Sequence, residues 1–86
     1  MDMRKLFEQA QQVQQQLAKE LEQAEVEAAS GGGLVRVRMN GKKEILSLVI
    51  EEEALAGGDR GMLQDLIIAA INQGSRKIDE LLASRM

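Results

Sequence analysis

A short run from Gly31 to Ile50 constrains the fold of this chain more than any other feature. Three consecutive glycines precede an alternating apolar segment that ends at Asn40-Gly41, and a second, mostly apolar segment continues to Ile50. Asn-Gly between two such segments predicts a β-hairpin with a type I′ turn, because both central residues of that turn need positive φ. Long helical patterns flank the hairpin on both sides. The sequence therefore predicts an α+β fold in which a small antiparallel sheet joins two long helices.

The expected boundaries within a single domain of residues 1–86 are a helix over 2–29, a glycine hinge over 30–33, a hairpin over 34–50, a loop over 51–59 and a helix over 60–85. Asp2 and Asp59 are suitable N-caps for the two helices. A narrow apolar stripe with spacings of three and four runs along the first helix and predicts one packing face against another helix. Its members are Leu6, Ala10, Val13, Leu17, Leu21, Ala24 and Ala28.

Composition excludes most functions that depend on a chemical site. The 86 residues include no histidine, cysteine, proline, tryptophan or tyrosine. This removes the usual general base, the usual thiol nucleophile and nearly every zinc arrangement, so we expect no catalytic site, no metal, no cofactor and no small-molecule substrate. The acidic run Glu51–Glu53 is expected to be a solvated surface. No apolar run approaches the ~20 residues that span a membrane and no secretory signal is visible, so the expected location is the cytoplasm.

Charge is distributed unevenly along the chain. Residues 31–50 form the only net positive segment, although the whole chain carries a formal charge of −3. Two interpretations stay open for its basic residues: protection of an exposed sheet edge, or contact with the phosphates of a nucleic acid. The overall charge argues against indiscriminate DNA binding but does not exclude a local basic patch. The basic residues of this segment are Arg36, Arg38, Lys42 and Lys43.

A chain of this size rarely buries enough apolar surface by itself, so we expect a partner chain. The helix is apolar nearly all round between Met62 and Ile71, and one small sheet cannot cover both of its sides. The excess, especially at Ile68, predicts a homodimer interface. The residues expected in that interface are Leu63, Leu66, Ile67, Ile68 and Ile71.

Three separated segments resemble the YbaB/EbfC family of bacterial nucleoid-associated proteins. They are residues 6–12 (Leu-Phe-Glu-Gln-Ala-Gln-Gln), residues 33–41 (Gly-Leu-Val-Arg-Val-Arg-Met-Asn-Gly) and residues 62–72, which are followed by Arg76-Lys77-Ile78. The resemblance covers nearly the whole chain. It implies an α-β-β-β-α domain and a tweezer-like homodimer whose protruding helices contact DNA. We expect the third strand to come from a division of the Glu44–Ile50 region.

The basic residues on and near the helices are the preferred candidates for contacting DNA. Arg4, Lys5 and Lys19 lie on the side of the first helix away from its apolar stripe, whereas Glu8 occupies a position where relatives often have lysine. Phe7 is the only aromatic residue, which disfavours stacking on single-stranded nucleic acid. The preferred DNA-binding set is Arg4, Lys5, Lys19, Arg76, Lys77 and Arg85; the hairpin residues Arg36, Arg38, Lys42 and Lys43 form the rival set.

The function predicted from the sequence is that of a nucleoid-associated protein which binds duplex DNA as a homodimer, mainly through phosphates. A role in nucleoid organisation or gene regulation would follow. The alternative is a helix-hairpin-helix interaction or scaffold module, similar in outline to prefoldin subunits, that binds a protein and no DNA. The acidic balance of the chain favours this alternative, and the family resemblance favours DNA.

Overall fold

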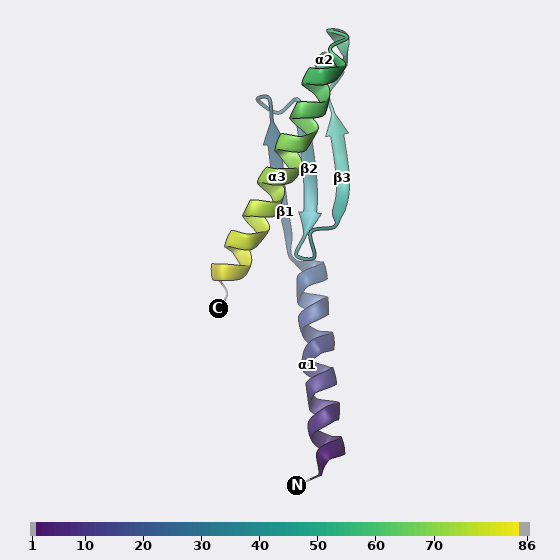
Figure 1. Ribbon diagram of the computed structural model, residues 1–86, viewed down its shortest axis with the longest axis vertical. Helices are drawn as coiled ribbons and strands as arrows, with labels where there is room; N and C mark the ends of the chain where they lie inside the picture. Colours follow the sequence, from purple (N-terminus) through teal and green to yellow (C-terminus); the bar gives the residue numbers. More distant parts are fainter. Residues whose placement is uncertain (1, 85–86) are drawn as a thin grey trace.

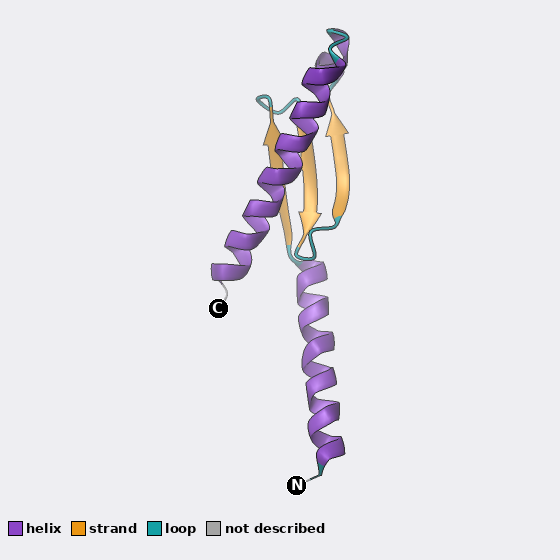
Figure 2. Cartoon of the chain, in the orientation of Figure 1, coloured by secondary structure: helices purple, strands orange, loops and turns teal. Residues whose placement is uncertain are grey.

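A computed structural model describes residues 2–84 of the chain as an elongated α-β-β-β-α domain measuring 67 × 20 × 17 Å. The first helix stands clear of the rest of the molecule, and the last helix lies across the sheet (Figures 1 and 2). The elements in chain order are α1 (Met3–Gln23), β1 (Glu25–Ser30), β2 (Val35–Asn40), β3 (Ile45–Ile50), α2 (Glu52–Ala56) and α3 (Arg60–Ser84). The short helix α2 lies inside the segment that we expected to be a loop.

Helix α1 begins where the sequence predicts but ends six residues earlier. The Asp2 carboxylate accepts a hydrogen bond from the backbone N–H of Arg4, as an N-cap does. The helix stops at Gln23, and Ala24 is already in extended conformation. The predicted helix over 2–29 is therefore wrong after Gln23.

The third strand comes from the end of the predicted helix and not from a division of the Glu44–Ile50 region. Strand β1 pairs antiparallel with β2 from Glu25↔Asn40 to Ser30↔Val35, and β2 pairs antiparallel with β3, so the sheet order is β1-β2-β3. Ala24 and Ala28 are four residues apart, which suits one side of a helix and also one side of a strand. Pairing with β2 decides between the two and overrides the helical preference of this Ala- and Glu-rich segment.

Two turns connect the three strands. Gly31, Gly32 and Gly33 all have positive φ and close the β1–β2 connection, so they form a hairpin turn and not a hinge after a helix. The β2–β3 hairpin lies where the sequence places it, but its turn is not type I′. Residues 41–43 close it, positive φ occurs at Lys43, and the Asn40 carboxamide oxygen accepts the backbone N–H groups of Lys42 and Glu44.

Helix α3 packs across one face of the sheet and makes the core. Asp59 caps its start by accepting the N–H of Met62 at 2.9 Å. The face it covers presents Ala28 from β1 with Val35 and Val37 from β2, all nearly inaccessible to solvent. Gly74 lets the helix approach Met39 closely, because a Cβ there would lie 3.2 Å from the Met39 Cε atom. The Ser30 hydroxyl donates to the backbone oxygen of Leu66 at 2.6 Å and ties β1 to α3.

The core-forming helix covers β1 and β2 but leaves β3 open (Figure 1). A helix is about 10 Å across and neighbouring strands lie about 4.8 Å apart, so one helix can shield about two strands. Ile45 and Leu48, whose register partners Met39 and Val37 are buried under α3, are 47% and 43% exposed. The sheet therefore has an uncovered apolar strip beside α3.

The end of α1 is held by the β2–β3 turn. The backbone N–H of Gly41 donates to the backbone oxygen of Leu21 at 2.7 Å. Gly41 is buried there, and a Cβ built on it would lie 2.6 Å from the same oxygen. The φ of Gly41 is not positive, so backbone conformation does not require a glycine here. The close approach of the two backbones does.

We expect Gly41→Ala to lower the free energy of unfolding by about 1–3 kcal/mol, because the added methyl group must displace the backbone of α1 or of the turn. Equilibrium unfolding in urea measures this change. Gly57→Ala is the matched control, since Gly57 has negative φ and no atom within 4 Å of the added Cβ. Equal stability of the two variants would contradict the role assigned to the Gly41–Leu21 contact.

Candidate nucleic-acid interface

Helix α1 presents exposed basic side chains near both of its ends. Arg4 and Lys5 lie at the free end, and Lys19 lies fifteen residues further on, near the sheet. No carboxylate forms an ion pair with any of the three within residues 2–84. The opposite side of the same helix carries the apolar stripe, where Leu6, Val13 and Leu17 are about half exposed. Helix α1 therefore has a polar side with available positive charge and an apolar side without cover from its own chain.

The basic residues of the hairpin are in a different state, because each one is paired with a carboxylate. The pairs are Arg36–Glu51 at 2.8 Å, Arg38–Glu25 at 3.6 Å, Lys42–Glu22 at 2.8 Å and Lys43–Asp79 at 2.9 Å. The acidic partners come from β1, from the start of α2 and from both long helices, so they surround the hairpin on several sides. Their charges compensate the local positive charge that the sequence indicates for residues 31–50.

One of these pairs changes the protonation equilibria of both partners. The hydrogen bond from the Lys42 Nζ atom lowers the pKa of Glu22, and the positive charges of Lys42 and Lys19 add to this shift. The same hydrogen bond raises the pKa of Lys42. Both side chains are exposed, so the pair contributes little to stability. As a consequence, Lys42 stays charged and paired with Glu22 at neutral pH.

Helix α3 contributes Arg76 and Lys77, both exposed. The Lys77 Nζ atom donates to the backbone oxygen of Glu27 at 2.7 Å, which places it beside strand β1. Arg4 and Lys5 lie at the far end of α1, so a single chain does not bring the two halves of the preferred set together (Figure 1). Arg85 lies outside the described residues.

The predicted dimer-interface residues divide into two groups. Leu63, Leu66, Ile67 and Ile71 are partly buried and pack against the core of their own chain. Ile68 is 55% exposed and points away from that core.

The exposed apolar residues of β3 were not predicted from the sequence. Their signal was the absence of alternation, since a strand that reads Ile-Leu-Ser-Leu-Val-Ile is typical of one covered on both faces.

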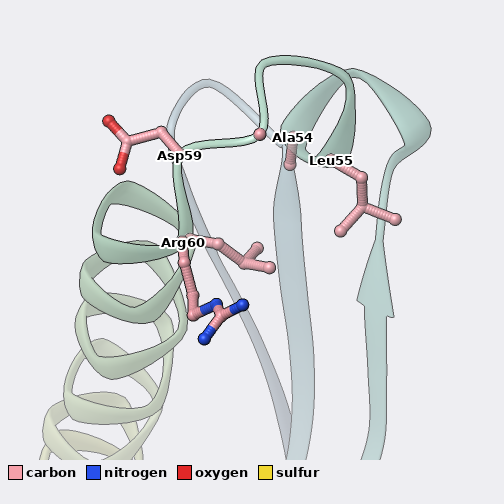
Figure 3. Close-up of a pocket in the computed structure, with 6 residues that line it drawn as sticks. Ala54, Leu55, Asp59 and Arg60 are labelled. Carbon is pink, nitrogen blue, oxygen red and sulfur yellow. The ribbon is translucent and has the colours of Figure 1, made fainter.

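A shallow pocket of about 190 Å³ lies between α2 and the start of α3 (Figure 3). Leu55 and Arg60 extend beside it, while the Asp59 carboxylate turns away and caps α3. No group of three or more potential metal ligands occurs within residues 2–84. In the same part of the chain, none of the helices combines the length and apolar character that crossing a bilayer requires. The one carboxylate in the lining of this pocket caps α3, so we take the basic surfaces as the main candidate for function.

The fold is that of a small α+β protein whose first helix carries exposed basic side chains and projects from a three-stranded sheet (Figure 1). The sequence profile of the YbaB/EbfC DNA-binding family matches residues 1–86. The chain belongs to this family. The resemblance of the three sequence segments is therefore confirmed over the whole chain.

Individual relatives agree with this assignment. A nucleoid-associated protein of Clostridium novyi is 49% identical, with 100% of this chain and 78% of the relative aligned. Another from Chloroflexus aurantiacus is 44% identical over 100% of this chain and 89% of the relative. The crystal structure of an uncharacterized protein from Helicobacter pylori superimposes with a TM-score of 0.79 at 26% identity, covering 98% of this chain and 91% of that one. The predicted α-β-β-β-α fold is thereby confirmed.

We expect Lys42→Ala to return the pKa of Glu22 toward its ordinary value, because the hydrogen bond that stabilises the carboxylate is lost. Carboxyl chemical shifts in a pH titration measure this directly. Since the folded-state pKa of Glu22 is lowered, any stability from the pair is present above the unfolded-state pKa and disappears as pH falls through the folded-state pKa. Lys5→Ala is the control and should leave the Glu22 titration unchanged; an unaltered pKa in Lys42→Ala would contradict the pairing.

Proposed function

We propose that the chain is a nucleoid-associated protein that binds duplex DNA as a homodimer, mainly through contacts of α1 with phosphates. The observation that carries this proposal is the contrast between the two basic surfaces. Arg4, Lys5 and Lys19 form no ion pair within residues 2–84, whereas all four basic residues of the hairpin are paired. Affinity for DNA arises largely when basic groups replace condensed counterions, and an already paired cation must first lose its carboxylate. The names of the relatives support the same assignment.

The apolar surface that α3 leaves open supports the homodimer in this proposal. Ile45 and Leu48 on β3 lie on the face of the sheet that α3 partly covers, and Ile68 is exposed on α3 itself. The ion pair between Lys43 of the β2–β3 turn and Asp79 marks the side of α3 that faces β3. By helical periodicity, Ile68 lies close to this side, because the eleven residues that separate it from Asp79 correspond to slightly more than three full turns. Packing α3 of a second copy against this strip would cover β3 and Ile68 together.

A second candidate function is the interaction module with a protein partner. The exposed apolar stripe of α1 favours it, since Leu6, Val13 and Leu17 offer a partner helix a row of side chains at helical spacing. The net charge of −3 also agrees with this function. Its distinguishing property is that the protein would not bind DNA even at low salt.

The test of DNA binding is fluorescence anisotropy of a labelled duplex across a salt series. With three phosphate contacts per protomer, a dimer should show a log–log salt slope of about −5, or about a thousandfold loss of affinity between 50 and 200 mM salt. A single strand of the same length serves as a control for duplex preference. Absence of binding at the lowest salt would contradict the proposal and favour the protein-partner function.

The matched pair of variants compares the two surfaces. Arg4→Gln/Lys5→Gln should weaken duplex binding and reduce the magnitude of the salt slope by up to about 3.6 per dimer, since four cations are removed. Lys42→Gln/Lys43→Gln removes the same number of charges from adjacent positions and should have a smaller effect. An equal or larger effect of the hairpin variant would move the binding site to the hairpin.

Ile68→Asp should dissociate the dimer, because it places a charge in the contact that α3 would make with the second copy. Sedimentation equilibrium measures the mass in solution. Leu55→Asp is the control, since Leu55 is equally exposed at 55% but belongs to α2 at the far end of the sheet. An unchanged mass of Ile68→Asp would exclude this interface.

A further inference from the structure

The polar side of α1 includes a straight row of five side chains. Arg4, Glu8, Gln11, Gln15 and Lys19 follow each other at intervals of four, three, four and four residues, so they lie along one line on the helix surface. All five are exposed. The row lies opposite the apolar stripe, so an assembly that covers Leu6, Val13 and Leu17 leaves the row open.

The middle of this row has the wrong chemistry for phosphates and the right chemistry for base edges. Six of the thirteen residues between Lys5 and Lys19 are glutamine, and none is basic. A carboxamide carries a donor and an acceptor side by side, which is the pattern that adenine presents in the major groove through its N6 amino group and N7. Only Gln11, Gln12 and Gln15 lie on the polar side; the other three glutamines flank the apolar stripe.

The dimensions of α1 match a major groove. The helix is about 10–12 Å in diameter and the groove is about 12 Å wide. Figure 1 shows that α1 extends beyond the sheet for most of its length, so the sheet does not obstruct its approach to a duplex. Arg4 and Lys19 are about 22 Å apart along the helix axis, and Gln11 and Gln15 lie between them, about 6 Å apart. The cations can therefore lie beside the phosphates that border the groove while the glutamines face the bases.

We propose that α1 enters the major groove of duplex DNA, where Gln11 and Gln15 hydrogen-bond to the exposed edges of adenine bases and give the protein a preference for particular sequences. Each carboxamide nitrogen donates to N7 and each carboxamide oxygen accepts from the N6 amino group. Arg4, Lys5 and Lys19 supply the phosphate contacts on which the proposed function depends, so this inference rests on that function. The glutamine contacts add sequence selectivity to the attraction between DNA phosphates and these three basic residues.

The experiment is a selection of bound sequences from a randomised duplex library by the full chain, followed by anisotropy with the selected duplex and a scrambled duplex of equal composition. The wild-type chain should prefer the selected duplex, with each bidentate contact contributing about five- to 150-fold. Gln11→Ala/Gln15→Ala should lose this preference while it keeps the affinity for the scrambled duplex and its salt slope. Alanine favours helix more than glutamine, so α1 stays helical, which circular dichroism verifies.

Gln14→Ala is the matched control, because it removes a glutamine from the same helix on the side of the apolar stripe, and it should keep the preference. Equal affinity of the wild-type chain for the selected and scrambled duplexes would overturn the inference and leave the proposed function intact. A preference that survives in Gln11→Ala/Gln15→Ala, or that is lost equally in Gln14→Ala, would also overturn it. Failure to bind any duplex would instead overturn the proposed function.

Discussion

One geometric constraint governs this structure: a single helix can shield only about two strands, and the sheet has three. Helix α3 packs on β1 and β2 through small residues, with Ala28 and Ala70 in the core and Gly74 against Met39. The register then leaves Ile45 and Leu48 of β3 beside it and without cover. The pairing of chains that we propose depends on how this deficit is filled.

The direction of α1 depends on a much smaller contact. The helix meets its own chain mainly at the β2–β3 turn, where Gly41 donates to Leu21 and Lys42 pairs with Glu22. These contacts fix the base of the helix, while all residues from Met3 to Leu17 are exposed to solvent. An isolated helix of this length is marginally stable in water, so its N-cap and its anchored end are important for keeping it formed.

Most of the fold was accessible from sequence, and the errors have a common physical origin. The hairpin, both N-caps and the long last helix follow from local patterns: the Asn-Gly signal, aspartate before a helical run, and a dense apolar period. The end of α1 did not follow, because Ala24 and Ala28 fit both a helix and a strand and only long-range pairing with β2 decides between them. The sequence could not predict for the same reason whether the basic residues of the hairpin are paired with carboxylates. Their carboxylate partners, such as Asp79 for Lys43, come from distant parts of the sequence.

The two edges of the sheet are not equivalent. Strand β1 carries Glu25 and Glu27, and the Lys77 ammonium group donates a hydrogen bond to the Glu27 carbonyl oxygen. This edge therefore carries charged side chains of both signs. Strand β3 has no charged residue at all. Charged edges resist the addition of further strands, and an uncharged edge invites it. In the homodimer that we propose, the second copy would lie over β3 and next to this edge, so mainly the charged edge would stay open and association would not propagate into a fibre.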